Sequence, residues 1–152
     1  MRMLSLRWSY LFFLVLITAF SCSSFAALGG DVNSVQSDQA QMRAQRRVIQ
    51  NAAYTIHEMQ TESTTVVREF VSPQGKVFGI SWQGPTRPDL QQMLGTYYSE
   101  FASARPAHRV HGPVTIRTPN LVIESGGHMR ALTGRAYVPA MVPANVRLED
   151  IK

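Results

Sequence analysis

The sequence predicts a small α+β domain in which an antiparallel sheet packs against one amphipathic helix. Apolar residues alternate at spacing two in 77–84, and they recur at helical spacing over 90–101. A second pair of runs suited to strands follows at 114–124. A sheet and a helix that each have one apolar face bury those faces against each other. We therefore expect an N-terminal helix, a three-strand meander, the amphipathic helix, and then a second hairpin or three further strands.

The first 26 residues have the pattern of a cleavable secretory signal. Arg2 and Arg7 form a basic start, an apolar run of ten residues spans 11–20, and small residues stand at Ser24 and Ala26. A membrane span needs about 20 apolar residues, so this run is too short for one. We expect cleavage after Ala26 and no transmembrane span in the mature chain.

Cys22 offers an alternative to ordinary cleavage. Residues 19–22 loosely match a lipoprotein cleavage site, but Phe20 stands where small residues are usual. This mismatch favours cleavage after Ala26 over lipidation at Cys22. Cys22 is the one cysteine, so the mature chain would have no disulfide and no cysteine-bound metal.

The composition of the mature chain suits one exported domain. The chain from Ala27 to Lys152 has 126 residues, and loss of Arg2 and Arg7 lowers the formal net charge from +5 to +3. Its arginines are dispersed, whereas a nucleic-acid surface requires basic clusters with stacking aromatics. We expect a periplasmic or secreted protein that binds no nucleic acid.

The mature chain divides into three parts. Residues 27–52 form a polar segment, and Val35, Met42 and Ile49 stand in it at heptad spacing, which predicts a helix within 31–50. Residues 53–138 form the α+β core. Residues 139–152, with two prolines and a short charged end, form a C-terminal tail.

Two strand-like runs joined by a tight turn begin the core. The first is 64–71, and the turn 72–75 has proline at its second position and glycine at its fourth. The run at 54–59 has a similar composition, which makes a three-strand meander. The alternating residues that we expect to point together at the core are Phe78, Ile80 and Trp82.

The clearest helical periodicity follows the meander. Pro88 suits a first helical turn, and Asp89 complements the positive end of the helix. An apolar stripe predicts one helix that covers the sheet. The residues of this stripe are Leu90, Met93, Leu94, Tyr97, Tyr98 and Phe101.

A second hairpin closes the core. Its predicted strands are 114–117 and 121–124, with a turn at 118–120. The two glycines of 125–128 predict a further turn, and 131–138 is suited to another strand.

Three histidines are the candidates for metal chemistry. His108 and His111 are separated by two residues in a loop bounded by proline and glycine, and His128 or Glu124 would have to converge on them. Two exposed histidines in a basic loop are the simpler interpretation. We therefore assign no metal ligand and no cofactor, and keep His108, His111 and His128 as weak candidates.

Other polar residues give no catalytic set. Glu58 and Glu69 fall in neighbouring strands, where acidic residues commonly form cross-strand pairs. The stretch 125–128 lacks the Gly-x-Ser-x-Gly pattern of a nucleophile elbow. Trp82 is interpreted as a core anchor, with the rim of a groove as its alternative.

Three stretches together resemble a known family. They are ALGG at 27–30, REFVSPQGKVFGISWQGPTRPDLQQMLG at 68–95 and ESGGHMRALTGRAYVPAMVP at 124–143. In this order they resemble the bacterial family known as domain of unknown function 2844. The resemblance implies an exported single-domain protein and carries no functional residue with it.

We expect a non-catalytic binding or accessory domain of the periplasm or cell envelope. Its partner would be an envelope protein or another envelope component, bound through the sheet or the loop 102–113. Two alternatives remain open. One is a small metal-dependent or hydrolytic enzyme that uses His108, His111 and His128, and the other is an envelope lipoprotein anchored through Cys22.

Overall fold

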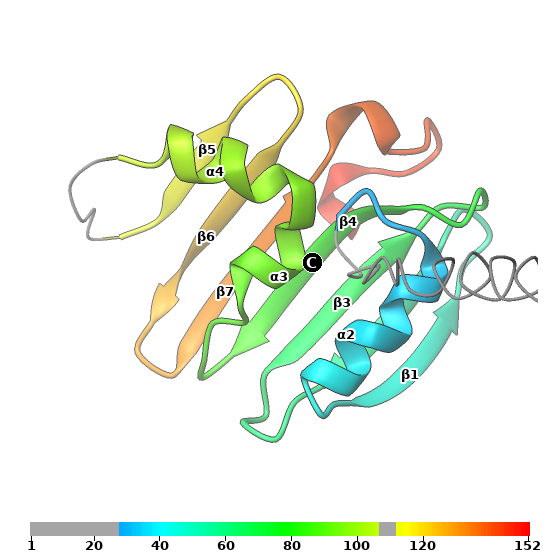
Figure 1. Ribbon diagram of the computed structural model, residues 1–152, viewed down its shortest axis with the longest axis horizontal. Helices are drawn as coiled ribbons and strands as arrows, with labels where there is room; N and C mark the ends of the chain where they lie inside the picture. The colour runs from blue at the N-terminus through cyan, green and yellow to red at the C-terminus, as the bar shows by residue number, and fades with distance from the viewer. Residues whose placement is uncertain (1–27, 107–111) are drawn as a thin grey trace, which may run out of the picture.

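A single seven-stranded antiparallel sheet organises the protein (Figure 1). The structure, a computed structural model, describes residues 28–106 and 112–152. Short helices lie on one side of the sheet, which we call the helix face. The strand order is β1-β2-β3-β4-β7-β6-β5. The strands are β1 (Gln45–Gln50), β2 (Thr55–Gln60), β3 (Val66–Val71), β4 (Val77–Gly84), β5 (Val114–Arg117), β6 (Val122–His128) and β7 (Ala131–Tyr137).

The predicted small three-strand sheet under one helix is wrong, because the fold is mostly β. The meander and the second hairpin are parts of one sheet, since β4 pairs with β7 along its length. This pairing joins segments far apart in the chain, for example Ile80 with Ala136. Periodicity reports only local structure, so the two halves looked separate.

The predicted N-terminal helix is also shorter than expected. A 3₁₀ turn (Val32–Ser34) leads into α2 (Val35–Gln41), and the chain then turns at Arg43, whose φ is 47°. Residues 45–50 form the edge strand β1 instead. Since nearly all of β1 is exposed on both faces, it lacks the alternation that marks a half-buried strand.

The predicted helix over 90–101 is interrupted. It divides into α3 (Leu90–Leu94), a 3₁₀ turn (Gly95–Tyr97) and α4 (Tyr98–Ala104). The break falls at Gly95, whose φ of 51° lies in the left-handed region that favours glycine. The apolar side still faces the sheet, because Met93, Leu94 and Phe101 are buried there.

A bulge in β4 separates two side chains that were expected to share a face. Phe70 lies opposite Gly79 and Val71 lies opposite Val77, so Phe78 is the extra residue. Ile80 and Trp82 pack on the helix face as predicted. Phe78 is equally buried but packs on the other side, and its ring centroid lies 6.2 Å from that of Phe70.

The glycines of 125–128 do not form a turn. They belong to β6, which pairs with both β5 and β7. The reversal comes at Met129 and Arg130, directly after His128. Glycines without side chains left no apolar pattern here, and this made a strand resemble a loop.

The C-terminal segment covers the second face of the sheet. It runs over 139–152 and contains two 3₁₀ turns, Pro139–Met141 and Leu148–Asp150. Val146 and Ile151 pack on this face against aromatic residues of the strands. Ile151 lies where a side chain at Gly79 would stand, since its Cδ1 is 3.3 Å from the Cβ position there. β4 is therefore covered on both sides.

Among residues 28–106 and 112–152, none of the helices combines the length and the apolar character that a membrane crossing needs. The predicted signal segment 1–26 and the two loop histidines, His108 and His111, lie outside the residues that the structure describes.

The packing of the Trp82 indole against Gly134 leads to a prediction about stability. A Cβ at position 134 would lie 2.1 Å from Cζ2 of Trp82, so Gly134→Ala must displace the indole from the core. Overpacking of this kind costs about 1–3 kcal/mol. We expect a loss of unfolding free energy in this range in urea titrations, with a red shift of the Trp82 emission.

Gly126→Ala is the matched control in the neighbouring strand. Its new Cβ would meet only ordinary contacts, the nearest at 3.6 Å from Pro113. Equal stability of the two variants would contradict the packing described for Trp82.

Candidate functional site

A groove of about 760 Å³ lies between the helix face of the sheet and the helices α3 and α4. We call it the α4 groove. Residues of β5, β6 and β7 form its floor. These three strands lie together at one end of the strand order. Pockets for small ligands have volumes of about 300–1,000 Å³, so the groove is large enough for one.

Apolar side chains form part of the floor and inner wall of the α4 groove, and polar atoms form the rest of its surface. Ile116 and Ile123 stand opposite each other on β5 and β6, and Val114 lies opposite Ser125. Tyr98 and Phe101 of α4 also line the groove, with ring centroids 5.9 Å apart. This lining suits the aliphatic or aromatic body of a ligand. Ser125 adds a hydroxyl group to the floor.

Two arginines give the α4 groove its charge. Arg87 precedes α3, and Arg105 follows α4 with its guanidinium 5.7 Å from the centre of the Phe101 ring. Neither forms an ion pair with a carboxylate of the described residues. Residues 1–27 and 107–111 contain no Asp or Glu. Both guanidinium groups are thus without a carboxylate partner from the chain's own side chains.

The carboxylate that lines the groove is already engaged. Asp89 caps α3, and its Oδ1 accepts hydrogen bonds from the backbone N–H groups of Gln91 and Gln92 at 2.8 and 3.4 Å. This confirms the predicted role of Asp89 at the start of a helix. The described charged groups of the groove are therefore two guanidinium groups and one carboxylate that already accepts two hydrogen bonds, so the net charge of its lining suits an anionic group on a ligand.

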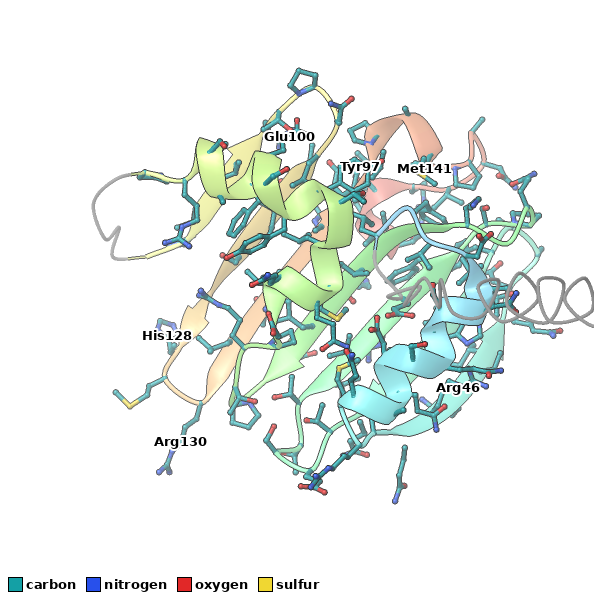
Figure 2. The ribbon with its side chains drawn as sticks, viewed as in Figure 1. Arg46, Tyr97, Glu100, His128, Arg130 and Met141 are labelled. Carbon is teal, nitrogen blue, oxygen red and sulfur yellow. The ribbon has the colours of Figure 1, made fainter. Side chains whose placement is uncertain are left out.

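His128 does not join a metal site within the described residues. It is exposed at the end of β6, where it pairs with Ala131, and it projects from the tip of the hairpin (Figure 2). Across 28–106 and 112–152, no three His, Cys, Asp or Glu side chains are grouped to hold a metal ion. Glu124 is held by Arg117 and Arg135 on the second face.

Glu58 and Glu69 lie on opposite faces of the sheet. Glu58 is on the second face, where it pairs with Arg47 at 2.6 Å and Arg68 at 2.9 Å. Burial acts to raise the pKa of Glu58, but the hydrogen bond and charge of Arg68, together with the charge of Arg47, lower it below its usual value. Glu69 points to the helix face and is buried.

The partner of Glu69 is Asp38, a residue that the sequence did not single out. Asp38 belongs to α2 and is fully buried, and its carboxyl group lies close enough to that of Glu69 to raise the pKa of Glu69. Gln92 of α3 donates from Nε2 to Asp38 Oδ1 at 2.6 Å. Asp38 follows Val35 by three residues, so both lie on the buried side of α2. This spacing of three residues was the one feature of the sequence that could have indicated that Asp38 is buried.

Burial keeps a proton on this acid pair. Desolvation raises the pKa of Asp38, although its hydrogen bonds with Glu69 and Gln92 act to lower it. Desolvation also raises the pKa of Glu69 well above its usual value, and the hydrogen bond and charge of Asp38 raise it further. Two ionised carboxylates cannot share such a site, so the pair holds a proton between α2 and β3.

His57 lies directly across from Glu69 on β2. Burial lowers the pKa of His57, and the charge of nearby Arg46 lowers it further, so the ring stays neutral near pH 7. Asp38, His57 and Glu69 are closed to solvent, and Gln92 and Arg46 are partly exposed. We therefore interpret the cluster as a structural clasp between α2, α3 and the sheet.

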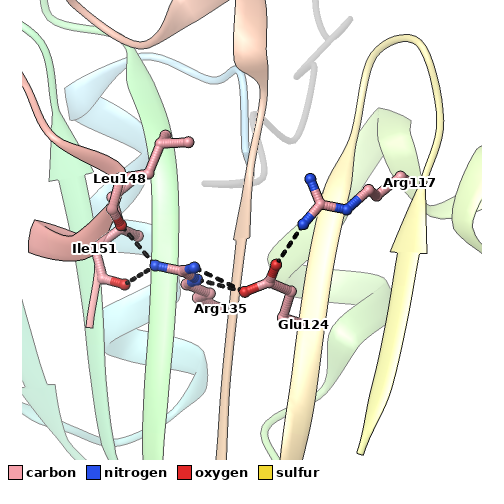
Figure 3. Close-up of polar contacts among 5 residues, drawn as sticks. All are labelled: Arg117, Glu124, Arg135, Leu148 and Ile151. Carbon is pink, nitrogen blue, oxygen red and sulfur yellow. Dashed lines mark hydrogen bonds and ion pairs between the residues drawn. The ribbon is translucent and has the colours of Figure 1, made fainter.

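Arginine side chains anchor the C-terminal segment on the second face (Figure 3). Arg135 pairs with Glu124 at 2.8 Å and donates to the carbonyl oxygen of Leu148 at 2.6 Å. Arg68 donates in the same way to the backbone oxygen of Lys152 at 3.2 Å. Each arginine thus connects a carboxylate of the sheet to a backbone carbonyl of the covering segment.

Comparison with known proteins places the chain in a family. A family described as "Protein of unknown function (DUF2844)" matches residues 24–151. The chain therefore belongs to the DUF2844 family, as the sequence resemblance indicated. No curated protein and no solved structure matches it.

The acid pair generates a prediction for the dependence of stability on pH. The folded chain keeps a proton that Glu69 of the unfolded chain releases near its ordinary pKa of 4.5. The contribution of this proton to the unfolding free energy is therefore fully present below that pH. It is lost as pH rises through the folded pKa, by about 1.4 kcal/mol per pH unit for one proton. Glu69→Gln keeps the shape and a donor for Asp38, so it should flatten this fall and stabilise the protein at alkaline pH.

Urea unfolding at a series of pH values from about 5 to about 9.5 measures this loss, and the difference between the parent and Glu69→Gln at each pH removes the contribution of His57, which both proteins share. Glu58→Gln is the control, because the pKa of Glu58 is lowered and its contribution is present above the unfolded pKa. This control should lose stability at neutral pH and keep the alkaline slope of the parent. An unchanged slope in Glu69→Gln would show that the pair is ionised.

Proposed function

We propose that this member of the DUF2844 family is an exported, non-catalytic binding domain of the cell envelope. Its ligand is an anionic amphiphile, a molecule with an apolar chain and one negatively charged head group, held in the α4 groove. The observation that carries this proposal is the pairing of aromatic side chains in the lining with two arginines that have no carboxylate partner. The envelope is rich in molecules of this type.

The residues of the α4 groove favour binding over catalysis. A hydrolytic site needs a nucleophile with a general base in hydrogen-bond reach. Among the described lining residues, Ser125 supplies a hydroxyl, and Asp89 supplies a carboxylate that already accepts two backbone hydrogen bonds. Arg87 and Arg105 instead present guanidinium groups, which bind carboxylate and phosphate groups by paired hydrogen bonds.

The orientation of the ligand follows from this arrangement. The chain of the amphiphile would lie along Ile116 and Ile123, beside the rings of Tyr98 and Phe101. Its negatively charged head group would accept hydrogen bonds from the guanidinium group of Arg87 or Arg105. Stacking on Phe101 restricts the Arg105 side chain, so less freedom is lost when an anion binds.

Export is supported by the sequence of the first 26 residues. The basic start, the apolar run of ten residues and the small residues before Ala27 together suit a signal peptidase substrate. The family match begins at residue 24, close to this boundary. A binding domain for envelope amphiphiles would have to reach that compartment.

The groove arginines generate a binding prediction. We expect laurate to displace the uncharged fluorescent probe N-phenyl-1-naphthylamine from the protein, and dodecyltrimethylammonium, which has the same chain length, to displace it far less. In the double variant Arg87→Gln and Arg105→Gln, laurate binding should weaken at least tenfold, because a hydrogen bond to a charged group contributes about 1.5–3 kcal/mol.

Arg43→Gln is the control for this experiment, because Arg43 is exposed, carries the same charge and lies outside the groove lining. Its laurate affinity should match that of the parent chain. Equal displacement by the cationic and anionic amphiphiles, or equal affinity in the double variant, would refute the proposed ligand class.

The N-terminal segment generates a second prediction. When the full chain is expressed in a bacterial host, the intact mass of the protein from the periplasmic or culture fraction should correspond to a chain that begins at Ala27. A lipid-modified chain that begins at Cys22 would instead support the lipoprotein alternative. An unprocessed chain confined to the cytoplasm would contradict export.

A further inference from the structure

The two outer edges of the sheet differ in how they are protected. At one edge, β5 has four residues and is bounded by Pro113 and Pro119. Short edge strands and prolines prevent another strand from adding to a sheet. At the other edge, β1 has six residues, contains no proline, and pairs only with β2 among the described residues. The outer N–H and C=O groups of β1 are therefore available to a further strand.

β1 also carries two exposed apolar side chains. Val48 and Ile49 are 47% and 36% exposed, and they are two of only four large apolar side chains exposed in the described parts of the chain. The other two, Met129 and Leu148, lie elsewhere and singly. Because successive strand residues point to opposite faces, each face of the β1 edge has one exposed apolar side chain. An added strand would cover both.

The surroundings of β1 are positively charged. Arg46 and Arg47 are on the strand, and Arg43 lies just before it; Figure 2 shows Arg46 beside α2. The nearby carboxylates do not balance this charge. Glu58 is shared by Arg47 and Arg68, and Asp38 and Glu69 hold a proton in the core. Charge complementarity therefore points to an acidic occupant.

We propose that the outer edge of β1 binds an extended acidic segment of a partner protein, which adds to the sheet as an eighth strand. Main-chain hydrogen bonds would give the affinity, and contacts with Val48, Ile49 and the arginines would give the specificity. A second copy of this chain fits less well, because it would bring its own Arg46 and Arg47 to the same edge. This surface is at the opposite end of the sheet from the α4 groove, so neither proposal depends on the other.

The test uses two synthetic eight-residue peptides, one of alternating valine and glutamate and one of alternating valine and lysine. We expect the acidic peptide to bind the mature chain in a fluorescence anisotropy titration, and the basic peptide to bind at least tenfold more weakly. Hydrogen exchange of the β1 amides should slow when the acidic peptide is added. An acidic peptide that is N-methylated at every residue should lose binding, because neither of its edges can then donate hydrogen bonds to β1.

Variants of the protein locate the site. Ile49→Ser removes an exposed apolar contact on β1 without changing its charge or disturbing the core, and should weaken binding of the acidic peptide at least tenfold relative to the parent. Thr115→Ser trims a side chain on the exposed face of the other edge strand and should leave binding unchanged.

Three results would overturn the proposal. They are equal binding of the acidic and basic peptides, full binding of the N-methylated peptide, and a slower exchange confined to β5. Dimerisation of the protein through β1 without binding of the acidic peptide would also refute it, and would identify a second copy as the occupant.

Discussion

The central strand β4 has no side open to solvent, and the rest of the fold is arranged around that constraint. Its residues 77–82 are all buried, with helices packed on one face and the C-terminal segment on the other. Every side chain of the strand must therefore meet a complementary surface. The indole of Trp82 lies over Gly134, and Ile151 occupies the space beside Gly79. The bulge at Phe78 moves one large ring from the crowded helix face to the other.

Charge is distributed across the two faces in different ways. On the second face, each carboxylate of the cross-strand row is held between arginines, as Glu58 is by Arg47 and Arg68. On the helix face, Asp38 and Glu69 share a proton and have no cation beside them in an ion pair. Among the described residues, Arg87 and Arg105 at one end of the sheet and Arg43 and Arg46 at the other form no ion pair with a carboxylate. The proposed ligand and the proposed partner each use one of these ends.

Local signals in the sequence predicted the local elements well. The turn at 72–75, the strands on either side of it and the start of the second hairpin are where the patterns placed them, because each rests on neighbouring residues, but β6 continues to His128 through the predicted turn. β1 was missed because an edge strand exposed on both faces has no alternation. The helix over 90–101 was predicted as continuous because its apolar stripe persists through Gly95, where only the backbone departs from helical geometry.

The candidate site was mostly beyond prediction from the sequence. The α4 groove assembles Arg87, Arg105 and Ser125 from three elements, and no spacing in the chain connects them. The acid pair likewise joins a helix to a strand with a long stretch of chain between them. Only the position of Asp38, one helical turn after Val35, gave a local indication that it is buried. The family match, by contrast, followed directly from stretches of sequence.

The β4–β7 pairing also determines the order in which the chain can acquire its structure. A nascent chain that has reached residue 84 contains β1 to β4, but the side of β4 that receives β7 has no partner until residues 131–137 have been made. At about 5–20 residues per second, that wait lasts ~3–10 s. During this interval the most buried strand of the folded protein would present an open edge to other chains. A chain kept unfolded until its last strand is complete avoids this aggregation hazard.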